Sequence, residues 1–447
     1  MMKSLHRVAV LLMAACSMQS LSAEQITLTE AGSLASTLGD RATTMSELTL
    51  VGPMNSADFA TLAEMGKENL KVLDLSAALP AGDSIPARAL VQARQITSLV
   101  LPQTTKCIGS MALAGLSIST IELPAALEYI APKAFRDPQG ILSSFTLTEG
   151  NQSFTLIDGI LYSADGQTLV LCPPAREGAV SVADETVRIE NSAFDYCKKI
   201  TSIQLPASVE ELGDESFSRA ESLVSINLEN IKEVGSNTFD GCSAFNGQNG
   251  VLSLPQIQNI GGYAFSSLPI VKVETGDALE TIGESAFWMC ENLTEASLGK
   301  NLKEIGNNAF HAADNLSKVY CYAEVPPVIV NDYNAINYIF EEEGTLYVPA
   351  GSIDAYKAAN LWERIAHIEA ISGTTGIEDL LETDYQVIGT EGGILVKGNA
   401  PVSVRVFKVS GVLVKEQTVD SHEQITLQKG IYFISLNGEK AKAIVVK

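Results

Sequence analysis

Apolar residues recur along the middle of the chain at fixed distances from a series of phenylalanines. Counted from Phe287, they lie five and one residues before it and three, six, nine and eleven residues after it: Ile282, Ala286, Cys290, Leu293, Ala296 and Leu298. The same positions are apolar or small around Phe194, Phe217 and Phe310, and weaker copies centre on Leu90, Leu113, Phe135, Phe239 and Phe265. Most anchors are 22 or 23 residues apart, but 26 residues separate Phe239 from Phe265 and an insertion interrupts Phe135 to Phe194. One such unit cannot bury its own apolar face, so the pattern predicts coils stacked into a solenoid with a continuous core.

Three cysteines share one position of this pattern, three residues after an anchor. The position holds Cys197, Cys242 and Cys290, and in other copies Ala220, Leu268 or Ala313, as expected for a small buried pocket. These cysteines are two coils apart, about 10 Å at a sheet spacing of about 4.8 Å, whereas a disulfide needs Cα atoms within about 7 Å. We therefore expect free, buried thiols that neither pair nor hold a metal.

The flanks of the repeats differ from them in pattern. Residues 24–82 combine two helical stretches with two strand-like runs and are predicted to form an N-terminal capping region, followed by repeats over residues 83–322. Near residues 150–180 an insertion carries FTLIDGILYSADGQTLVLCPP, whose Asp165-Gly166 indicates a β-hairpin that we expect to protrude from the stack. Residues 323–371 end in TLYVPAGSIDAYKAANLWERI, a strand and a helix that form a C-terminal cap.

The last part of the chain changes pattern again. A polar linker over residues 372–382 leads into residues 383–447, where about seven short β-rich runs are separated by turn residues. Such short alternating strands predict a small β-sandwich that folds independently of the repeats.

The start of the chain predicts export. Residues 1–23 have a basic beginning, an apolar run and small residues, which is typical of a secretory signal peptide and too short to span a bilayer. Two endings compete: cleavage near residue 23, or lipidation of Cys16 after the lipobox-like Leu12-Met13-Ala14-Ala15. The sequence predicts no transmembrane helix elsewhere.

The repeated I-G-x-x-A-F-x-x-C-x-x-L-x-x-I-x-L-P resembles the BspA-type leucine-rich repeat of bacterial surface and secreted proteins. The resemblance covers roughly residues 46–371 and includes the Asp158-Gly159-Ile160-Leu161-Tyr162 hairpin and the terminal Tyr347-Val348-Pro349-Ala350-Gly351. It implies a β-rich, right-handed leucine-rich-repeat solenoid followed by the small C-terminal β-sandwich. It also implies a role in adhesion or macromolecule binding.

The C-terminal domain is similar to the sorting domains of type IX secretion cargo in Bacteroidota. The features that carry the similarity are Val404-Arg405-Val406-Phe407 before Gly411, Leu427-x-x-Gly430-Ile431-Tyr432, and the closing Ala443-Ile444-Val445-Val446-Lys447. The similarity implies that residues 383–447 direct or anchor export. A plain accessory β-domain is the alternative.

No motif in the sequence indicates catalysis, a cofactor or a metal. Phosphate loops, dinucleotide fingerprints and the serine elbow are absent, and His311, His367 and His422 lie too far apart in sequence to form a zinc motif. Neighbouring carboxylates give no facing pair of the kind a glycosidase needs. The formal charge of −23 repels phosphate backbones, so nucleic acid is excluded as a partner.

Binding is therefore the stronger functional class. Outward-pointing residues of two neighbouring coils, Ser202, Gln204, Ser225 and Asn227, are candidate ligand-facing positions on an extended sheet. Asp83-Ser84-Ile85 resembles a Bacteroidota O-glycosylation acceptor at Ser84. We predict a non-catalytic, monomeric, secreted or cell-surface protein that binds a protein or glycan on host or bacterial surfaces; a structural or periplasmic spacer without a ligand is the alternative.

Overall fold

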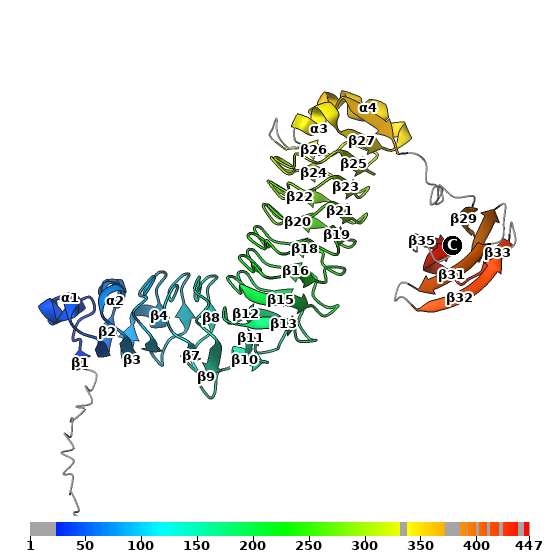
Figure 1. Cartoon of the computed structure of the whole chain (residues 1–447). Helices are drawn as coiled ribbons and strands as arrows, with labels where there is room; N and C mark the ends of the chain where they lie inside the picture. The colour runs from blue at the N-terminus through cyan, green and yellow to red at the C-terminus, as the bar shows by residue number, and fades with distance from the viewer. Residues whose placement is uncertain are drawn as a thin grey trace, which may run out of the picture. The chain divides into compact units, whose positions relative to one another are not determined.

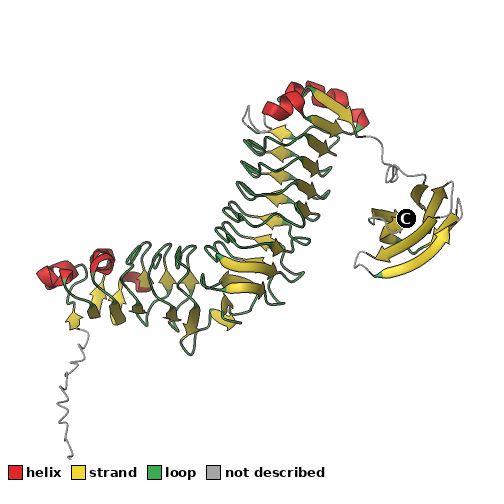
Figure 2. Ribbon diagram, in the orientation of Figure 1, coloured by secondary structure: helices red, strands yellow, loops and turns green. Residues whose placement is uncertain are grey.

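The computed structural model describes residues 24–330, 338–371, 385–390, 392–398, 402–408, 412–419, 423–436 and 442–446 (Figure 1). The chain forms two compact units, one of Met1–Ser317 and Pro327–Phe340 and one of Lys318–Pro326 and Glu341–Lys447. The predicted signal peptide over residues 1–23, with Cys16, and the linker over residues 372–382 lie outside the described residues. Figure 2 shows a chain built mainly from strands and loops, with α-helices before β3 and after β26.

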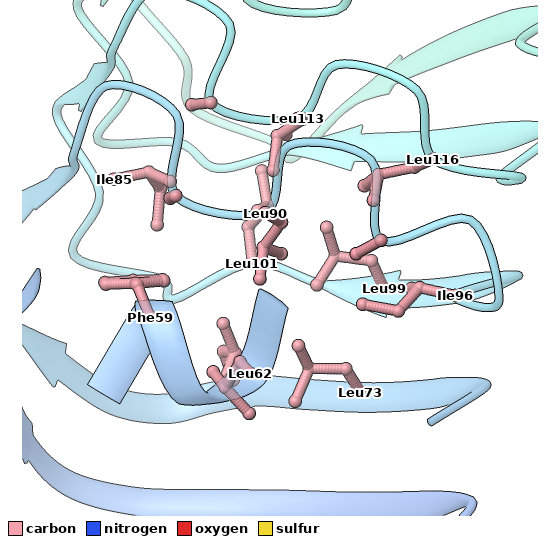
Figure 3. Close-up of a cluster of buried hydrophobic side chains, with 14 of the residues drawn as sticks. Phe59, Leu62, Leu73, Ile85, Leu90, Ile96, Leu99, Leu101, Leu113 and Leu116 are labelled. Atoms are coloured by element: carbon pink, nitrogen blue, oxygen red, sulfur yellow. The ribbon is translucent and has the colours of Figure 1, made fainter. Parts of the chain in front are cut away.

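The N-terminal region closes the first coil with a helix and a parallel sheet. The sheet has the order β1 (Glu24–Thr27), β2 (Glu47–Met54), β3 (Val72–Pro80) and β5 (Ser98–Val100), and its helices are α1 (Leu34–Leu38) and α2 (Ser56–Glu68). Asn55 starts α2 with a capping box that it shares with Asp58. Phe59 and Leu62 of α2 then pack in one buried cluster with Leu90 of the first repeat (Figure 3). The capping helix thus removes the edge of the repeat core from water.

Each repeat contributes short parallel strands to sheets on two sides of the stack. On one side β4 (Ser84–Ile85), β6 (Cys107–Ile108) and β8 (Tyr129–Ile130) pair in that order. The same side continues as a ten-stranded sheet of β10 (Phe154–Ile157), β11 (Ile160–Ser163), β12 (Thr168–Leu171), β14 (Arg188–Ile189), β16 (Glu211–Leu212), β18 (Glu233–Val234), β20 (Asn259–Ile260), β22 (Thr281–Ile282), β24 (Glu304–Ile305) and β26 (Val328–Ile329).

The other side of the stack carries three shorter runs of strands. β7 (Thr120–Leu123) pairs with β9 (Ser144–Leu147), and β13 (Glu177–Ser181), β15 (Lys199–Gln204) and β17 (Ser225–Ile226) form a sheet of their own. A further sheet then begins with β19 (Val251–Leu254), β21 (Lys272–Thr275) and β23 (Glu295–Leu298). The backbone ladder on this side is therefore interrupted between β17 and β19.

The predicted anchors form the core of the stack. The rings of Phe194, Phe217, Phe239, Phe265, Phe287 and Phe310 stack in sequence with centroids 5.1–5.6 Å apart. The glycine of the repeat follows from the close approach of neighbouring coils, since a Cβ on Gly283 would lie 2.6 Å from the carbonyl carbon of Gly261. The six cysteines of the described chain are free, and Cys197, Cys242 and Cys290 are fully buried, which confirms their expected role as core residues.

The insertion between Phe135 and Phe194 is part of the sheet, so the predicted protrusion is wrong. β10, β11 and β12 form two antiparallel hairpins, the second around Ala164-Asp165-Gly166, and β12 pairs in parallel with β14 of the next coil. Ile160, Leu161 and Tyr162 are buried, because this segment supplies apolar side chains to the core rather than leaving it. The stack changes direction at this insertion (Figure 1).

The second unit contains a strand and helix segment followed by the C-terminal domain. β25 (Lys318–Cys321), β27 (Thr345–Val348) and β28 (His367–Ala370) pair in parallel, and α4 (Ile353–Ala358) follows β27, as the sequence predicts. α3 covers Tyr338–Glu343. The buried Tyr356 of α4 donates its hydroxyl to the carbonyl oxygen of Ala323 at 2.9 Å.

The described residues of the C-terminal domain form seven strands in two antiparallel sheets. One sheet has the order β29 (Tyr385–Thr390), β30 (Gly393–Gly398) and β33 (Glu423–Thr426). The other has the order β32 (Leu413–Val419), β31 (Val402–Lys408), β34 (Gly430–Leu436) and β35 (Lys442–Val446). Ile394 and Ile425 of the first sheet belong to one buried cluster with Val404 and Ile434 of the second.

Candidate functional site

The four residues predicted to face a ligand lie together. Ser202 and Ser225 are register partners on β15 and β17, and Gln204 and Asn227 follow them two residues later. They line a groove of about 470 Å³ together with residues of β13, β19 and the loop before β19. The lining residues from the neighbouring segments include Ser181, Leu228, Glu229, Phe245, Gln248 and Ser253.

The groove exists because the coil that starts at Phe239 is longer than its neighbours. Phe245 fills the core position six residues after the anchor and stacks on Phe239 with centroids 5.1 Å apart. Residues 246–249 are then extra, and Leu252 and Leu254 fill the next two core positions four residues later than in a regular coil. The extra residues displace the chain at the point where β19 would otherwise pair with β17.

A tight turn fixes the extra residues. Asn249 and Gly250 both have positive φ, 55° and 87°, as a two-residue hairpin turn of type I′ requires. Gln248 and Val251 exchange two backbone hydrogen bonds across this turn, at 2.8 and 3.1 Å. Gly247 must also be glycine, because a Cβ there would lie 2.2 Å from the carbonyl oxygen of Val251. The wall of the groove is therefore a rigid feature of the fold.

The predicted residues do not all have the same role. The Asn227 side chain accepts a hydrogen bond from the Leu205 amide at 2.7 Å and donates one to the Leu205 carbonyl oxygen at 3.0 Å. It thus replaces a backbone rung and shapes the groove, which corrects the expectation that it only points outward. Gln204 and Ser225 are exposed and Ser202 is half-buried, so these three present polar groups to the groove. The sequence did not single out Gln248 or Ser253, although the 26-residue spacing was a signal for this coil.

The groove carries a single acidic side chain. Glu229 is the one charged residue among those that line it. Within the described ranges, no group of His, Cys, Asp or Glu side chains is arranged to hold a metal ion.

Burial raises the pKa of the Cys290 thiol to about 12 and raises the pKa values of the Cys197 and Cys242 thiols as well. These thiols are therefore protonated at neutral pH and are poor nucleophiles.

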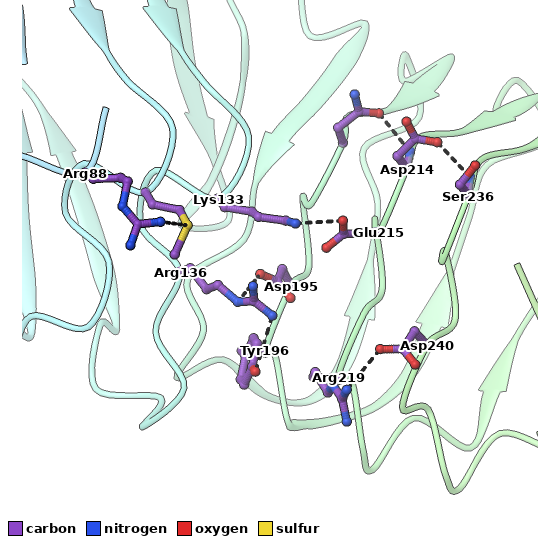
Figure 4. A network of polar contacts seen from close by, with 12 residues as sticks. Arg88, Lys133, Arg136, Asp195, Tyr196, Asp214, Glu215, Arg219, Ser236 and Asp240 are labelled. Carbon is purple, nitrogen blue, oxygen red and sulfur yellow. Dashed lines mark hydrogen bonds and ion pairs between the residues drawn. The ribbon is translucent and has the colours of Figure 1, made fainter. Parts of the chain in front are cut away.

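A second polar cluster lies where the insertion separates the two groups of repeats (Figure 4). Arg136 follows the anchor Phe135, Asp195 follows the anchor Phe194, and Arg136 Nε lies 3.3 Å from Asp195 Oδ2. The Arg136 guanidinium also stacks 4.7 Å from the centroid of the Tyr196 ring. Burial raises the pKa of Asp195 to about 7, against the opposing effect of Arg136. We interpret this cluster as a joint between coils rather than as a ligand site.

The predicted acceptor Ser84 and one aromatic pair at the surface are separate from the groove. Ser84 lies half-buried in β4, and its hydroxyl donates to the carbonyl oxygen of Gly82 at 3.1 Å. Tyr263 and Trp288 meet edge to face at 6.3 Å, with Tyr263 exposed and Trp288 half-buried. Within the described chain, no helix combines the length and the apolar character that crossing a bilayer requires.

A comparison with protein-family models identifies the repeats. The family model of the BspA type leucine rich repeat region matches six copies over residues 81–159, 179–249 and 243–329, just over half of the chain. Residues 374–446 match a domain of unknown function, DUF6383. No curated protein matches the chain.

Solved structures that match part of the chain come from several bacteria. The pneumococcal vaccine antigen PcpA is 17% identical with a TM-score of 0.47, over 73% of this chain and 79% of that one. A leucine rich cell surface protein from Faecalibacterium prausnitzii A2-165 is 21% identical with a TM-score of 0.43, over 65% of this chain and 74% of that one. A leucine-rich repeat protein from Eubacterium ventriosum is 17% identical with a TM-score of 0.46, over 62% and 79%.

Proposed function

The chain belongs to the BspA-type leucine-rich-repeat family, and from this premise we propose that it is a non-catalytic, exported protein that binds a macromolecule on host or bacterial surfaces. The observation that supports the proposal is the polar groove across β13, β15, β17 and β19. A stacked-coil surface offers one set of side chains per coil and suits a large, extended partner better than a small molecule. The spacer alternative requires no such groove.

We expect the groove to be needed for retention of the partner. Arginine in place of the exposed Ser225 fills the groove without removing a core side chain, so binding should weaken at least about tenfold, as expected for about 1.4 kcal/mol. Purified residues 24–447 would be immobilised and tested for retention of host matrix proteins and bacterial surface extracts. The control is Ser297→Arg, which introduces arginine at a half-buried position of β23 outside the groove residues.

The two functional classes give different outcomes. Loss of retention in Ser225→Arg with normal retention in Ser297→Arg supports a binding function through the groove. Equal retention by both variants would show that the binding site lies elsewhere, for example on the surface around Tyr263 and Trp288. No retention by the unaltered protein supports a spacer.

We further propose that residues 1–23 are a signal peptide and that residues 383–447 form a β-sandwich for sorting or anchoring. The shared buried cluster of the two C-terminal sheets supports a domain with its own core. The match of residues 374–446 to a domain of unknown function is compatible with this role but does not identify a function.

Removal of residues 383–447 is expected to leave binding unchanged and to stop delivery to the cell surface or medium. The reason is that the repeat core and the C-terminal core consist of different residues. Fractionation of expressing cells measures the location, and the retention assay measures the binding. Normal surface display of the shortened chain contradicts the sorting role, whereas loss of binding in the purified truncation shows that the C-terminal domain contributes to the ligand site.

A further inference from the structure

One backbone hydrogen bond between neighbouring coils is missing beside the groove. On this side of the stack, one backbone hydrogen bond joins each coil to the coil before it. The Val224 amide donates to the Thr201 carbonyl oxygen at 2.8 Å. The Val271 amide donates in the same way to the Gly250 carbonyl oxygen at 2.7 Å, and the Thr294 amide to the Val271 carbonyl oxygen at 2.8 Å. The regular pattern would continue from the Gly250 amide to the Val224 carbonyl. Neither of these two groups has a backbone hydrogen-bond partner in the part of the chain that the structure describes. The outer edge of β17 is therefore an open strand edge.

The open edge also uncovers an apolar side chain. Ile226 occupies the core position nine residues after its anchor, and the equivalent Ile203 and Ala296 are 4% and 0% exposed. Ile226 is instead half-buried, because β19 does not lie against β17. The site thus combines an apolar contact with unpaired backbone groups, the two features that strand addition uses for affinity and specificity.

We propose that the groove binds an extended peptide segment of the partner, which adds as a strand to the open edge of β17. This inference rests on the proposed binding function and specifies its ligand. The Val224 carbonyl accepts a hydrogen bond from a peptide amide, and the Gly250 amide donates to a peptide carbonyl. An apolar side chain of the peptide packs on Ile226, while the amide of Gln248 and the hydroxyl of Ser253 line the other wall.

The lining favours a peptide over a sugar. Sugar rings commonly stack on exposed aromatic side chains, and the one aromatic residue in the lining, Phe245, is 1% exposed. Charge narrows the peptide further. Glu229 in the groove and a formal chain charge of −23 favour a neutral or basic peptide over an acidic one. The rigid turn at Asn249-Gly250 means that the edge is already exposed before the peptide arrives.

The test uses 12-residue peptides selected by phage display on immobilised residues 24–447. Selected peptides are synthesised with a fluorescent label, and their affinity is measured by anisotropy. Methylation of single peptide amides should weaken binding at least tenfold at alternate positions only, because a strand directs every second amide toward its partner. Loss at every position or at none contradicts strand addition.

Two protein variants address the same site. Deletion of residues 246–249 restores the 22-residue spacing between Phe239 and Phe265, so β19 should pair with β17 and peptide affinity should fall at least tenfold. Ile226→Thr keeps a β-branched residue and removes the apolar contact, so a fall of about tenfold is expected. Circular dichroism and thermal unfolding confirm that each variant is folded, and Ser297→Arg is the control with unchanged affinity.

The outcomes separate this inference from the proposed function. If residues 24–447 retain surface extracts but select no peptide, or bind a glycan array instead, strand addition is wrong and the binding function stands. If the deletion variant is folded and binds the peptides as before, the open edge is not the site. If neither extracts nor peptides bind, both proposals fail.

Discussion

Replacement of Phe287 by alanine is expected to lower the free energy of unfolding of the repeats by about 3–5 kcal/mol. Phe287 is fully buried, and its ring lies between those of Phe265 and Phe310, with centroids 5.6 and 5.1 Å away. The close approach of the coils prevents the neighbours from filling the space, so a cavity remains. Chemical denaturation of residues 24–447, followed by circular dichroism, measures the change.

An exposed apolar residue provides the control for this prediction. Leu79 is 54% exposed, so Leu79→Ala should change the free energy of unfolding by no more than about 0.5 kcal/mol. If the denaturation midpoint of Phe287→Ala equals that of the unaltered protein, the stacked phenylalanine rings are not the main core.

The second large effect concerns pH. Asp195 has a pKa of about 7 in the folded chain, compared with its usual 3.8, because its side chain is buried. The folded state therefore holds a proton that the unfolded state has released, and stability falls as pH rises from about 4 to about 7. The difference between the pKa values of the folded and unfolded states corresponds to about 4 kcal/mol of stability, all of which is lost above pH 7.

Asparagine at position 195 should remove this pH dependence. Asp195→Asn cannot ionise, and Arg136 keeps its stacking on Tyr196. We expect the melting temperature of the unaltered protein to fall between pH 5 and pH 8, and that of the variant to stay nearly level over this range. An unchanged slope in the variant would show that Asp195 ionises without cost in the fold.

The positions of the core could be predicted because a repeated unit reports the same slots many times. All nine proposed anchors are buried, including the leucines at 90 and 113. The insertion was predicted correctly as a hairpin and wrongly as a protrusion. The sequence pattern on the two sides of Ala164-Asp165-Gly166 indicates strands, but the parallel pairing of β12 with β14 depends on a partner that is distant in the chain.

The groove could be predicted only in part, for a related reason. Periodicity places Ser202, Gln204 and Ser225 on one face, and the structure brings them together. The periodicity of the sequence also reveals a spacing of 26 residues after Phe239. Periodicity does not show that the extra residues open the ladder on this side, nor that Asn227 bonds to the Leu205 backbone. Those features arise from how two neighbouring coils fit.

The most direct test of the binding account is hydrogen–deuterium exchange of residues 24–447 with and without a retained partner. Slower exchange on binding is expected at residues 224–229 and 245–253, which carry the open edge and the opposite wall of the groove. The amide of Gly250 should show the largest change, since it gains the hydrogen bond that the fold leaves out. Protection confined to the C-terminal domain or to the coils around Tyr263 and Trp288, with no change at residues 245–253, would contradict the account.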